Sequence, residues 1–330
     1  MVQDNTWFDC DDGTRLYLRR WMPELSNTEK NGKQKAVLHI VHGMAEYGGR
    51  YHRLAEKLCS CGIEVWAADQ RGHGKTADLN VNDPGKGGLE GHSADDEMYE
   101  LLSSDVHAIN LLIRKTRPDV PVFLLGHSWG SFIAQYYIER YNDVPGSING
   151  CILSGTRGPG GIKIRAGIHM MRIFTLLCGQ RNSSSLARHI IDSPYHKPFR
   201  PNRTKFDWIS RDTAEVDAYI NDSFCGGLCS TGFYRELVTG LFRLHFPDAM
   251  SRINKDLPIY IFCGNADPVG DMGTSPTALI NAYRSLGIKD LEFVLYPGAR
   301  HETLNETNRE EVMDNLLSWI DRHSGIHSGE

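Results

Sequence analysis

Apolar runs alternate with amphipathic stretches along most of the chain. The runs are short and nearly continuous, which predicts buried strands, and the stretches between them repeat every 3.6 residues, which predicts helices. The expected strands cover residues 35–43, 63–69, 120–126, 150–155, 257–264 and 291–298, and the expected helices cover 51–59, 96–115, 131–141, 275–286 and 308–321. At the N-terminus, residues 5–9 and 14–21 alternate polar and apolar positions on either side of a turn, which predicts an antiparallel hairpin.

The alternation of strand and helix predicts an α/β protein with a mostly parallel, doubly wound sheet and helices on both faces. Residues 156–250 interrupt this rhythm, and they are too many for a loop. They contain helix-like pieces such as "GIHMMRIFTLLCG" together with polar, turn-rich segments. We therefore expect residues 1–155 and 251–330 to form the core, and residues 156–250 to form a helical cap inserted between two core strands. An inserted cap is expected over the carboxyl ends of the strands, where α/β proteins bind ligands.

Composition and charge exclude several classes of function. The chain has 330 residues and a net charge of −5, and no basic stretch is interleaved with aromatic residues, so no nucleic-acid partner is expected. Its longest apolar runs are strand-sized and too short to cross a bilayer. The N-terminal residues lack a basic segment followed by an apolar one, so no signal peptide is expected. The eight cysteines form no C-x-x-C pair and match no zinc module, which favours a reducing, cytoplasmic location and no metal site.

The tripeptide Gly-His-Ser occurs twice, and the surrounding sequence separates the two copies. Gly126-His127-Ser128-Trp129-Gly130 fits the pattern G-x-S-x-G, directly after a predicted strand and directly before a predicted helix. This is the setting of a nucleophile elbow, in which a strained turn exposes the serine hydroxyl. The two glycines let the backbone pass close by without a Cβ clash, and the partial positive charge of the helix N-terminus suits an oxyanion. Ser128 is therefore predicted to be a nucleophile.

The other copy, Gly91-His92-Ser93, lacks this context. The residues before it read "NDPGKGGLE" rather than a strand, and Asp95 stands where the second glycine of the pattern would be. Ser93 fits better as the N-cap of the following helix, because acidic residues at 95–97 would then lie near the positive end of that helix.

A serine nucleophile needs a general base, and the base needs an acid that orients it. In this kind of fold the chain order is serine, acid, histidine, with the last two on loops after later strands. Asp267 follows the strand 257–264, and His301 follows the strand 291–298. Each residue alone would also fit an ordinary turn aspartate or loop histidine. Their joint placement, each at a strand end and in the right order, favours a triad with Ser128.

Other candidates fit less well. His127 is next to the serine, where neighbouring side chains point apart, and His73 lies in the glycine-rich "DQRGHG", which indicates a tight turn. Asp69 comes too early in the chain for the usual acid. His42 follows the first core strand, where the fold places the oxyanion loop.

Stabilisation of an oxyanion needs two backbone N–H donors. One is expected from Trp129, the residue after the nucleophile, and the other from Met44, in the loop after the first core strand. The alternative is that His42 and Gly43 only shape that turn.

Four segments in order, "HGMAEYGGRY", "AADQRGHGKT", "GHSWG" and "PGARHETLNE", resemble the monoacylglycerol lipase and lysophospholipase-like branch of the α/β-hydrolase fold. The resemblance spans about residues 36–155 and 256–322. It implies hydrolysis of carboxylic esters through an acyl-enzyme, without metal or cofactor, beneath a mobile lid lined with apolar side chains. By position it places the triad on Ser128, Asp267 and His301, and the oxyanion donors on Met44 and Trp129.

Two features bear on the substrate. Tyr47 stands where many members of the family carry histidine, near the expected entrance to the site, which affects recognition of the head group. The cap also supplies a set of apolar residues that either accept acyl chains and touch a membrane surface transiently, or simply pack as helix core: Ile162, Ile164, Ile168, Met170, Met171, Ile173, Phe174, Leu176 and Leu177.

The expected function is hydrolysis of a small acyl ester, of the monoacylglycerol or lysophospholipid class. Because a fold does not fix a reaction, thioester, amide or peptide hydrolysis and acyl transfer remain alternatives on the same triad. An α/β-hydrolase-like binding protein without catalysis is a further alternative, although such a protein would be expected to lack part of the triad.

Overall fold

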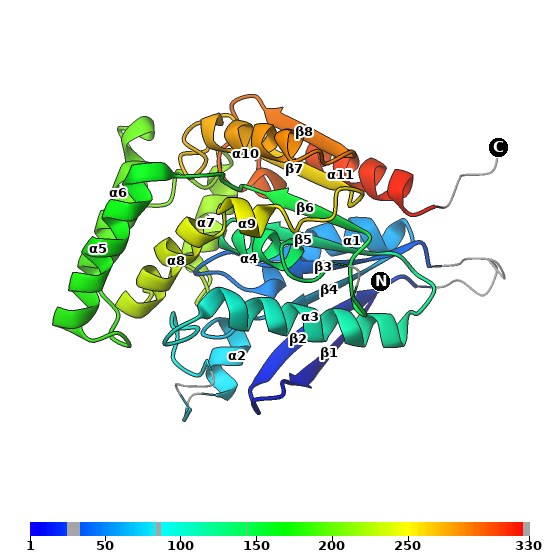
Figure 1. Ribbon diagram of the computed structural model, residues 1–330, viewed down its shortest axis with the longest axis horizontal. Coiled ribbons are helices and arrows are strands. Elements are labelled where there is room, and N and C mark those ends of the chain that lie inside the picture. The colour runs from blue at the N-terminus through cyan, green and yellow to red at the C-terminus, as the bar shows by residue number, and fades with distance from the viewer. Residues whose placement is uncertain (25–33, 81, 84–86, 143, 326–330) are drawn as a thin grey trace.

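A computed structural model describes residues 1–24, 34–80, 82–83, 87–142 and 144–325, and the side chains at 161–163 are not described. Its centre is an eight-stranded sheet in the order β1-β2-β4-β3-β5-β6-β7-β8 (Figure 1). The β1–β2 and β2–β4 pairs are antiparallel, and the other pairs are parallel. The strands are β1 (Val2–Asp9), β2 (Arg15–Met22), β3 (Ala36–Val41), β4 (Ile63–Ala68), β5 (Val122–His127), β6 (Gly150–Ser154), β7 (Ile259–Gly264) and β8 (Leu291–Tyr296). The α/β class and the N-terminal hairpin predicted from the sequence are confirmed.

Burial explains why the strands differ in sequence. Every residue of β3 to β7 is buried, because helices cover both faces of the sheet, and these strands are therefore mostly apolar, with the buried exceptions His39, Glu64, His127 and Ser154. The edge strand β1 is mostly exposed, and most of its residues are polar.

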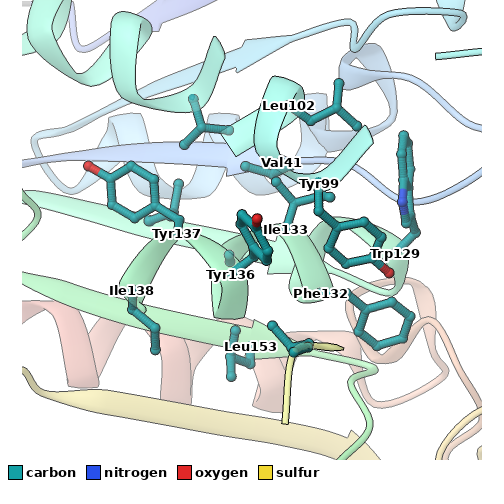
Figure 2. Packing of buried hydrophobic residues seen from close by; sticks show 14 of the residues in the cluster. Val41, Tyr99, Leu102, Trp129, Phe132, Ile133, Tyr136, Tyr137, Ile138 and Leu153 are labelled. Atoms are coloured by element: carbon teal, nitrogen blue, oxygen red, sulfur yellow. The ribbon is translucent and has the colours of Figure 1, made fainter. Parts of the chain in front are cut away.

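Helices form a layer on each face of the sheet. One layer contains α3 (Met98–Thr116), α4 (Trp129–Ile138) and α10 (Thr274–Ser285), and the other contains α1 (His52–Ser60) and α11 (Arg309–His323). Figure 2 shows Phe132, Ile133 and Tyr136 of α4 packed near Tyr99 and Leu102 of α3. Because β5 and α4 are buried on all sides, the turn between them has a fixed position.

The segment between β6 and β7 is helical, as predicted. It contains α5 (Gly161–Cys178), α6 (Ser185–His196), α7 (Thr213–Asn221), α8 (Thr231–Arg243) and α9 (Pro247–Met250). In Figure 1, α5, α6 and α8 lie together at the left, at one end of the sheet. Buried residues of α5 and α8, such as Met171 and Phe233, belong to the same apolar cluster as α3 and α4. The division into a core and a cap thus stays a prediction, since the two share one hydrophobic core.

Two local predictions differ from the structure. The "DQRGHG" turn leads into a short helix, α2 (Gly74–Leu79), which was not expected. Ser93 is not an N-cap: α3 begins only at Met98, after Glu97 with a positive φ of 52°. The buried Ser93 hydroxyl instead donates to the Arg71 carbonyl oxygen (2.7 Å), so it stabilises the loop before the helix.

In the part of the chain that the structure describes, no helix is both long and apolar enough to span a bilayer.

Candidate active site

Ser128 stands on a sharp turn between β5 and α4. The strand ends at His127 and the helix begins at Trp129, while Ser128 itself has φ 51° and ψ −123°. A positive φ is costly for a residue with a Cβ, so the surrounding structure must hold it in place. One such restraint is the hydrogen bond from the Ser128 N–H to the Ser154 carbonyl oxygen of β6 (2.9 Å).

The two glycines of the motif are required by close backbone contacts. A Cβ on Gly126 would lie 2.4 Å from the Gly130 carbonyl oxygen, and a Cβ on Gly130 would lie 2.1 Å from the Val41 carbonyl oxygen. Side-chain carbons do not approach backbone oxygens this closely. The pattern G-x-S-x-G therefore follows from packing α4 directly against the ends of β5 and β3.

The three residues of the predicted triad lie in one chain of hydrogen bonds. The His301 Nε2 atom is 2.8 Å from the Ser128 Oγ atom, and the His301 Nδ1 atom is 2.9 Å from the Asp267 Oδ2 atom. Asp267 is fully buried after β7, and its other oxygen accepts the Val269 N–H (2.8 Å). The carboxylate thus has a fixed orientation, and it in turn orients the imidazole.

Charge around His301 opposes the effect of its burial. Burial alone would disfavour the imidazolium, but Asp267, with smaller contributions from Glu302 and Glu46, outweighs it and raises the His301 pKa above its ordinary value of 6.5. The rings of His127 and Trp208 flank the imidazole, with centroids at 5.0 and 5.1 Å. The result is a buried histidine that is a stronger proton acceptor than an exposed one.

The other histidines near the turn have structural partners. Burial lowers the pKa of His42 and His127 to about 4 and that of His73 to about 3, so all three are neutral. The His42 ring joins two loops, because Nε2 accepts the Gln70 N–H (2.9 Å) and Nδ1 lies 2.8 Å from the Gly43 carbonyl oxygen. His127 Nδ1 is near the Ser154 hydroxyl (3.2 Å) rather than Ser128.

Asp69 is also structural. Its carboxylate pairs with Arg19 and accepts the Gly48 and Lys75 backbone N–H groups, each at 2.9 Å. It fixes the start of α2, away from His301.

The two predicted oxyanion donors come from different segments, one next to Ser128 in the chain and one in the loop after β3. Trp129 is the first residue of α4, so its N–H has no acceptor within the helix. Met44 lines the same pocket as Ser128, and within the described residues its N–H makes no hydrogen bond. Both groups are thus available, and their role as oxyanion donors stays a prediction.

Ser128 and His301 line a pocket between the core loops and the helical segment. The core contributes residues such as Met44 and Glu46, and the helical segment contributes Arg188, Asp192, Phe206, Trp208, Ile209, Tyr219 and Tyr234. Tyr47 is not among the described residues that line it. Its hydroxyl donates to Asp222 (3.0 Å) and its ring lies against Phe224, so it contacts the outer side of the helical segment instead.

Sequence reasoning missed a charged pair on α6. Asp192 is 8% exposed, and its Oδ2 atom pairs with the Arg188 Nε atom (3.1 Å), while its Oδ1 atom has no hydrogen-bond partner among the described residues. Burial outweighs the attraction of Arg188 and raises the Asp192 pKa. In the sequence, the pair is four residues apart on an amphipathic helix, which is indistinguishable from an ordinary surface ion pair.

The apolar set on α5 divides between two faces. Ile164, Ile168 and Met171 are buried in the core cluster, whereas Ile173, Leu176 and Leu177 are 57%, 85% and 80% exposed. Met170 and Phe174 are intermediate, and the Ile162 side chain lies outside the described ones. The buried face packs as helix core, whereas a role of the exposed face in contacting lipid stays a prediction.

Within the described residues, one group of side chains could bring metal-binding atoms together, and it lies far from Ser128. Asp290, Glu292 and His323 are at the amino end of β8, opposite the pocket. They already pair with one another and with Arg322, because His323 contacts Asp290 (3.0 Å) and Arg322 binds Glu292 with two hydrogen bonds.

Comparison with known proteins shows the family of the chain. A monoacylglycerol lipase of Mycolicibacterium smegmatis is 27% identical over 312 residues, covering 94% of each chain, and a monoglyceride lipase of Mus musculus is 27% identical over 315 residues, covering 94% of this chain and 88% of its own. A carboxyl esterase of Bacillus coagulans, solved in complex with glycerol, superposes with a TM-score of 0.84 at 24% identity over 98% and 99% of the two chains. Residues 32–308 match the family model described as serine aminopeptidase, S33. The chain therefore belongs to that family of α/β-hydrolase-fold enzymes.

Proposed function

We propose that the protein hydrolyses carboxylic esters of lipid-like substrates, of the monoacylglycerol or lysophospholipid class. The observation that carries this proposal is the hydrogen-bonded series Ser128–His301–Asp267 at the base of a pocket. The monoacylglycerol and monoglyceride lipases among its relatives support ester hydrolysis as the reaction.

In the proposed reaction, Ser128 Oγ attacks the ester carbonyl carbon while His301 Nε2 accepts its proton. The Met44 and Trp129 N–H groups stabilise the negative oxygen of the tetrahedral intermediate. His301 then gives the proton to the leaving alcohol as the C–O bond breaks, which leaves an acyl-Ser128. A water molecule, deprotonated by His301, attacks this acyl group, and the carboxylic acid leaves as Ser128 regains its proton. Asp267 keeps the imidazole in the required tautomer throughout.

We further propose that residues 156–250 act as a cap that selects the substrate. Seven side chains that line the pocket come from this segment. Its aromatic members, such as Phe206 and Trp208, can contact an acyl chain, whereas Asp192 can accept a hydrogen bond from a hydroxyl of the leaving alcohol.

The side chains of Ile173, Leu176, Leu177 and Leu186, near the end of α5 and the start of α6, are exposed, and we propose that they act as one apolar patch. Apolar patches on a protein surface mark contacts with partners or membranes. For an enzyme with lipid substrates, we propose that this patch touches the lipid surface transiently. A cytoplasmic location is part of the same proposal, and it rests on eight cysteines that are all free thiols.

The function can be tested with a panel of substrates. Purified protein is given 4-nitrophenyl esters of rising chain length, monoacylglycerol, lysophosphatidylcholine and an aminoacyl anilide, with a fluorophosphonate probe in parallel. We expect labelling of Ser128 and turnover of monoacylglycerol. Faster cleavage of the anilide would overturn the ester proposal in favour of an aminopeptidase, and labelling that persists in Ser128→Ala would exclude Ser128 as the nucleophile.

Asp192→Asn tests the site for the leaving alcohol. The loss of a charged hydrogen-bond acceptor should lower kcat/KM for monoacylglycerol about tenfold, the equivalent of one such bond. Hydrolysis of 4-nitrophenyl butyrate, whose leaving group has no aliphatic hydroxyl, should be unchanged. Asp217→Asn on the exposed face of α7 is the matched control and should affect neither substrate. Equal loss with both substrates would show that Asp192 serves the fold rather than the alcohol.

A further inference from the structure

Arg50 lies behind the pocket and joins two buried carboxylates. Its side chain is 11% exposed, and it makes two hydrogen bonds to Glu302 (2.7 and 2.8 Å) and one to Glu46 (2.8 Å). Both acids are almost fully buried, with 5% and 3% exposure. Despite that burial, the guanidinium lowers the pKa of each acid, so all three groups are charged.

Each of the two carboxylates belongs to a loop of the proposed reaction. Glu46 accepts the Gly43 N–H (2.5 Å), and Gly43 immediately precedes Met44, the expected oxyanion donor. Glu302 immediately follows His301, the expected base. The loop that would hold the oxyanion and the loop that would hold the base are therefore connected through a single guanidinium.

The helical segment adds a third connection. The Arg50 guanidinium lies over the ring of Tyr219 in α7, 4.8 Å from its centroid. The Tyr219 hydroxyl donates to the Ala45 carbonyl oxygen (2.8 Å), and Ala45 follows Met44. The Met44 backbone is thus held on one side through Gly43 and on the other through Ala45, and both restraints lead to Arg50.

We propose that Arg50 is a positioning residue for the hydrolysis proposed above, which sets the oxyanion loop relative to His301. It contacts neither Ser128 nor His301 directly, so its effect passes through Glu46 and Glu302. The expected benefit is preorganisation, since an oxyanion donor contributes only when it is held at the correct distance.

Arg50 also balances charge around the base. Among the described residues, the charged or titratable groups that face this region are Asp267, Glu302, Glu46, His127, His42, Cys225, Tyr51 and Tyr219. Removal of the guanidinium leaves the carboxylates without their positive partner. Because negative charge near His301 favours the imidazolium, the His301 pKa should rise further, and the acid limb of the pH–rate profile should move to higher pH.

The test compares the pH dependence of kcat/KM, and kcat and KM separately, for Arg50→Met and Arg50→Lys with 4-nitrophenyl butyrate. For Arg50→Met we expect kcat to fall about 100-fold, as for the loss of one oxyanion donor, with KM changed less than about threefold. The acid limb should shift upward. Arg50→Lys should return the limb toward its original position but recover kcat only in part, because an ammonium cannot reproduce the two-pronged contact with Glu302.

Arg71→Met is the matched control. Arg71 is also buried and joins two carboxylates, with two hydrogen bonds to Asp105 (2.7 and 2.8 Å) and one to Asp12 (2.5 Å), but none of these residues lines the Ser128 pocket. The Arg71→Met variant should have a lower Tm than the wild type. Its kcat per folded molecule and the pH of its acid limb should be unchanged.

The outcomes separate the possibilities. An Arg50→Met enzyme with unchanged kcat and acid limb, or one that behaves like Arg71→Met, would overturn the inference. If Arg50→Met does not fold, Arg50→Lys decides, because full kcat in that variant excludes a positioning role for the guanidinium. Failure of the proposed function looks different, since the wild-type protein would then neither cleave esters nor take up the fluorophosphonate at Ser128.

Discussion

The two Gly-His-Ser segments show how little a tripeptide determines. Ser128 has a positive φ, borders a pocket and contacts a histidine from a distant loop. Ser93 is 1% exposed, and its hydroxyl is used in a hydrogen bond to the Arg71 carbonyl oxygen. The difference arises from the backbone around each serine and from the element that follows it.

The histidines His92 and His301 differ even more clearly in their expected function, although their hydrogen-bond partners are of the same types. His92 lies between Ser230 and Asp95, with Nδ1 2.7 Å from Ser230 Oγ and Nε2 3.1 Å from Asp95 Oδ1. The molecule thus contains a second hydrogen-bonded set of serine, histidine and aspartate. Ser230, however, is buried and accepts the Phe233 N–H as the N-cap of α8, and Arg181 binds Asp95 with two hydrogen bonds. The same three residue types here connect the helical segment to the core by hydrogen bonds.

The largest expected difference between the two segments is in activity. Ser128→Ala should lower kcat/KM at least 1,000-fold, because in the described part of the chain no other hydroxyl lies at His301 Nε2. Ser93→Ala should keep full specific activity and lose roughly 0.5–1.5 kcal/mol of stability, the contribution of one hydrogen bond, because the buried Arg71 carbonyl oxygen still has His73 Nδ1 as a donor (3.0 Å). Measurements of ester hydrolysis and thermal unfolding on both variants test this. Comparable losses of activity would show that Ser128 and Ser93 do not differ in their role in catalysis.

A second difference should appear with pH. Protonated His301 cannot accept the Ser128 proton, and its pKa is raised above 6.5, so kcat/KM should fall about tenfold per pH unit below that raised pKa and level off above it. The His92 pKa is lowered instead, mainly by burial, so His92 should not titrate in this range. His92→Gln should therefore leave the acid limb in place. A limb that moves in this variant would mean that the two histidines are coupled.

The smallest expected effect comes from completing the pattern in the second segment. Asp95→Gly creates Gly-x-Ser-x-Gly at residues 91–95, yet it should produce no new nucleophile, since Ser93 remains buried and far from His301. Loss of the contacts from His92 and Arg181 should cost about 1 kcal/mol, because the ion pair is partly exposed. Fluorophosphonate labelling of Ser128→Ala combined with Asp95→Gly measures this, and any labelling of Ser93 would show that the pattern alone suffices.

The sheet and the three proposed catalytic residues could be predicted because they depend on local patterns. Buried parallel strands are mostly apolar runs. Ser128 follows β5 directly, and Asp267 and His301 lie in the loops that begin at the ends of β7 (Gly264) and β8 (Tyr296). The start of α3 could not be placed, since the positive φ at Glu97 has no signature in the sequence. Asp192 and Arg50 were missed for another reason. A charged residue looks solvated until the fold buries it, and their partners and positions depend on contacts between distant segments, such as Arg50 with Glu302.

The turn at Ser128 also sets a limit on how stable the protein can be. A serine at φ 51° costs roughly 1–3 kcal/mol that a glycine would not, because glycine has no Cβ to clash. Replacement of the nucleophile by glycine would thus relieve the turn and abolish the chemistry in one step. Selection for activity favours serine at this position, whereas selection for stability favours glycine. Other interactions in the fold must therefore offset the free-energy cost of the strained turn.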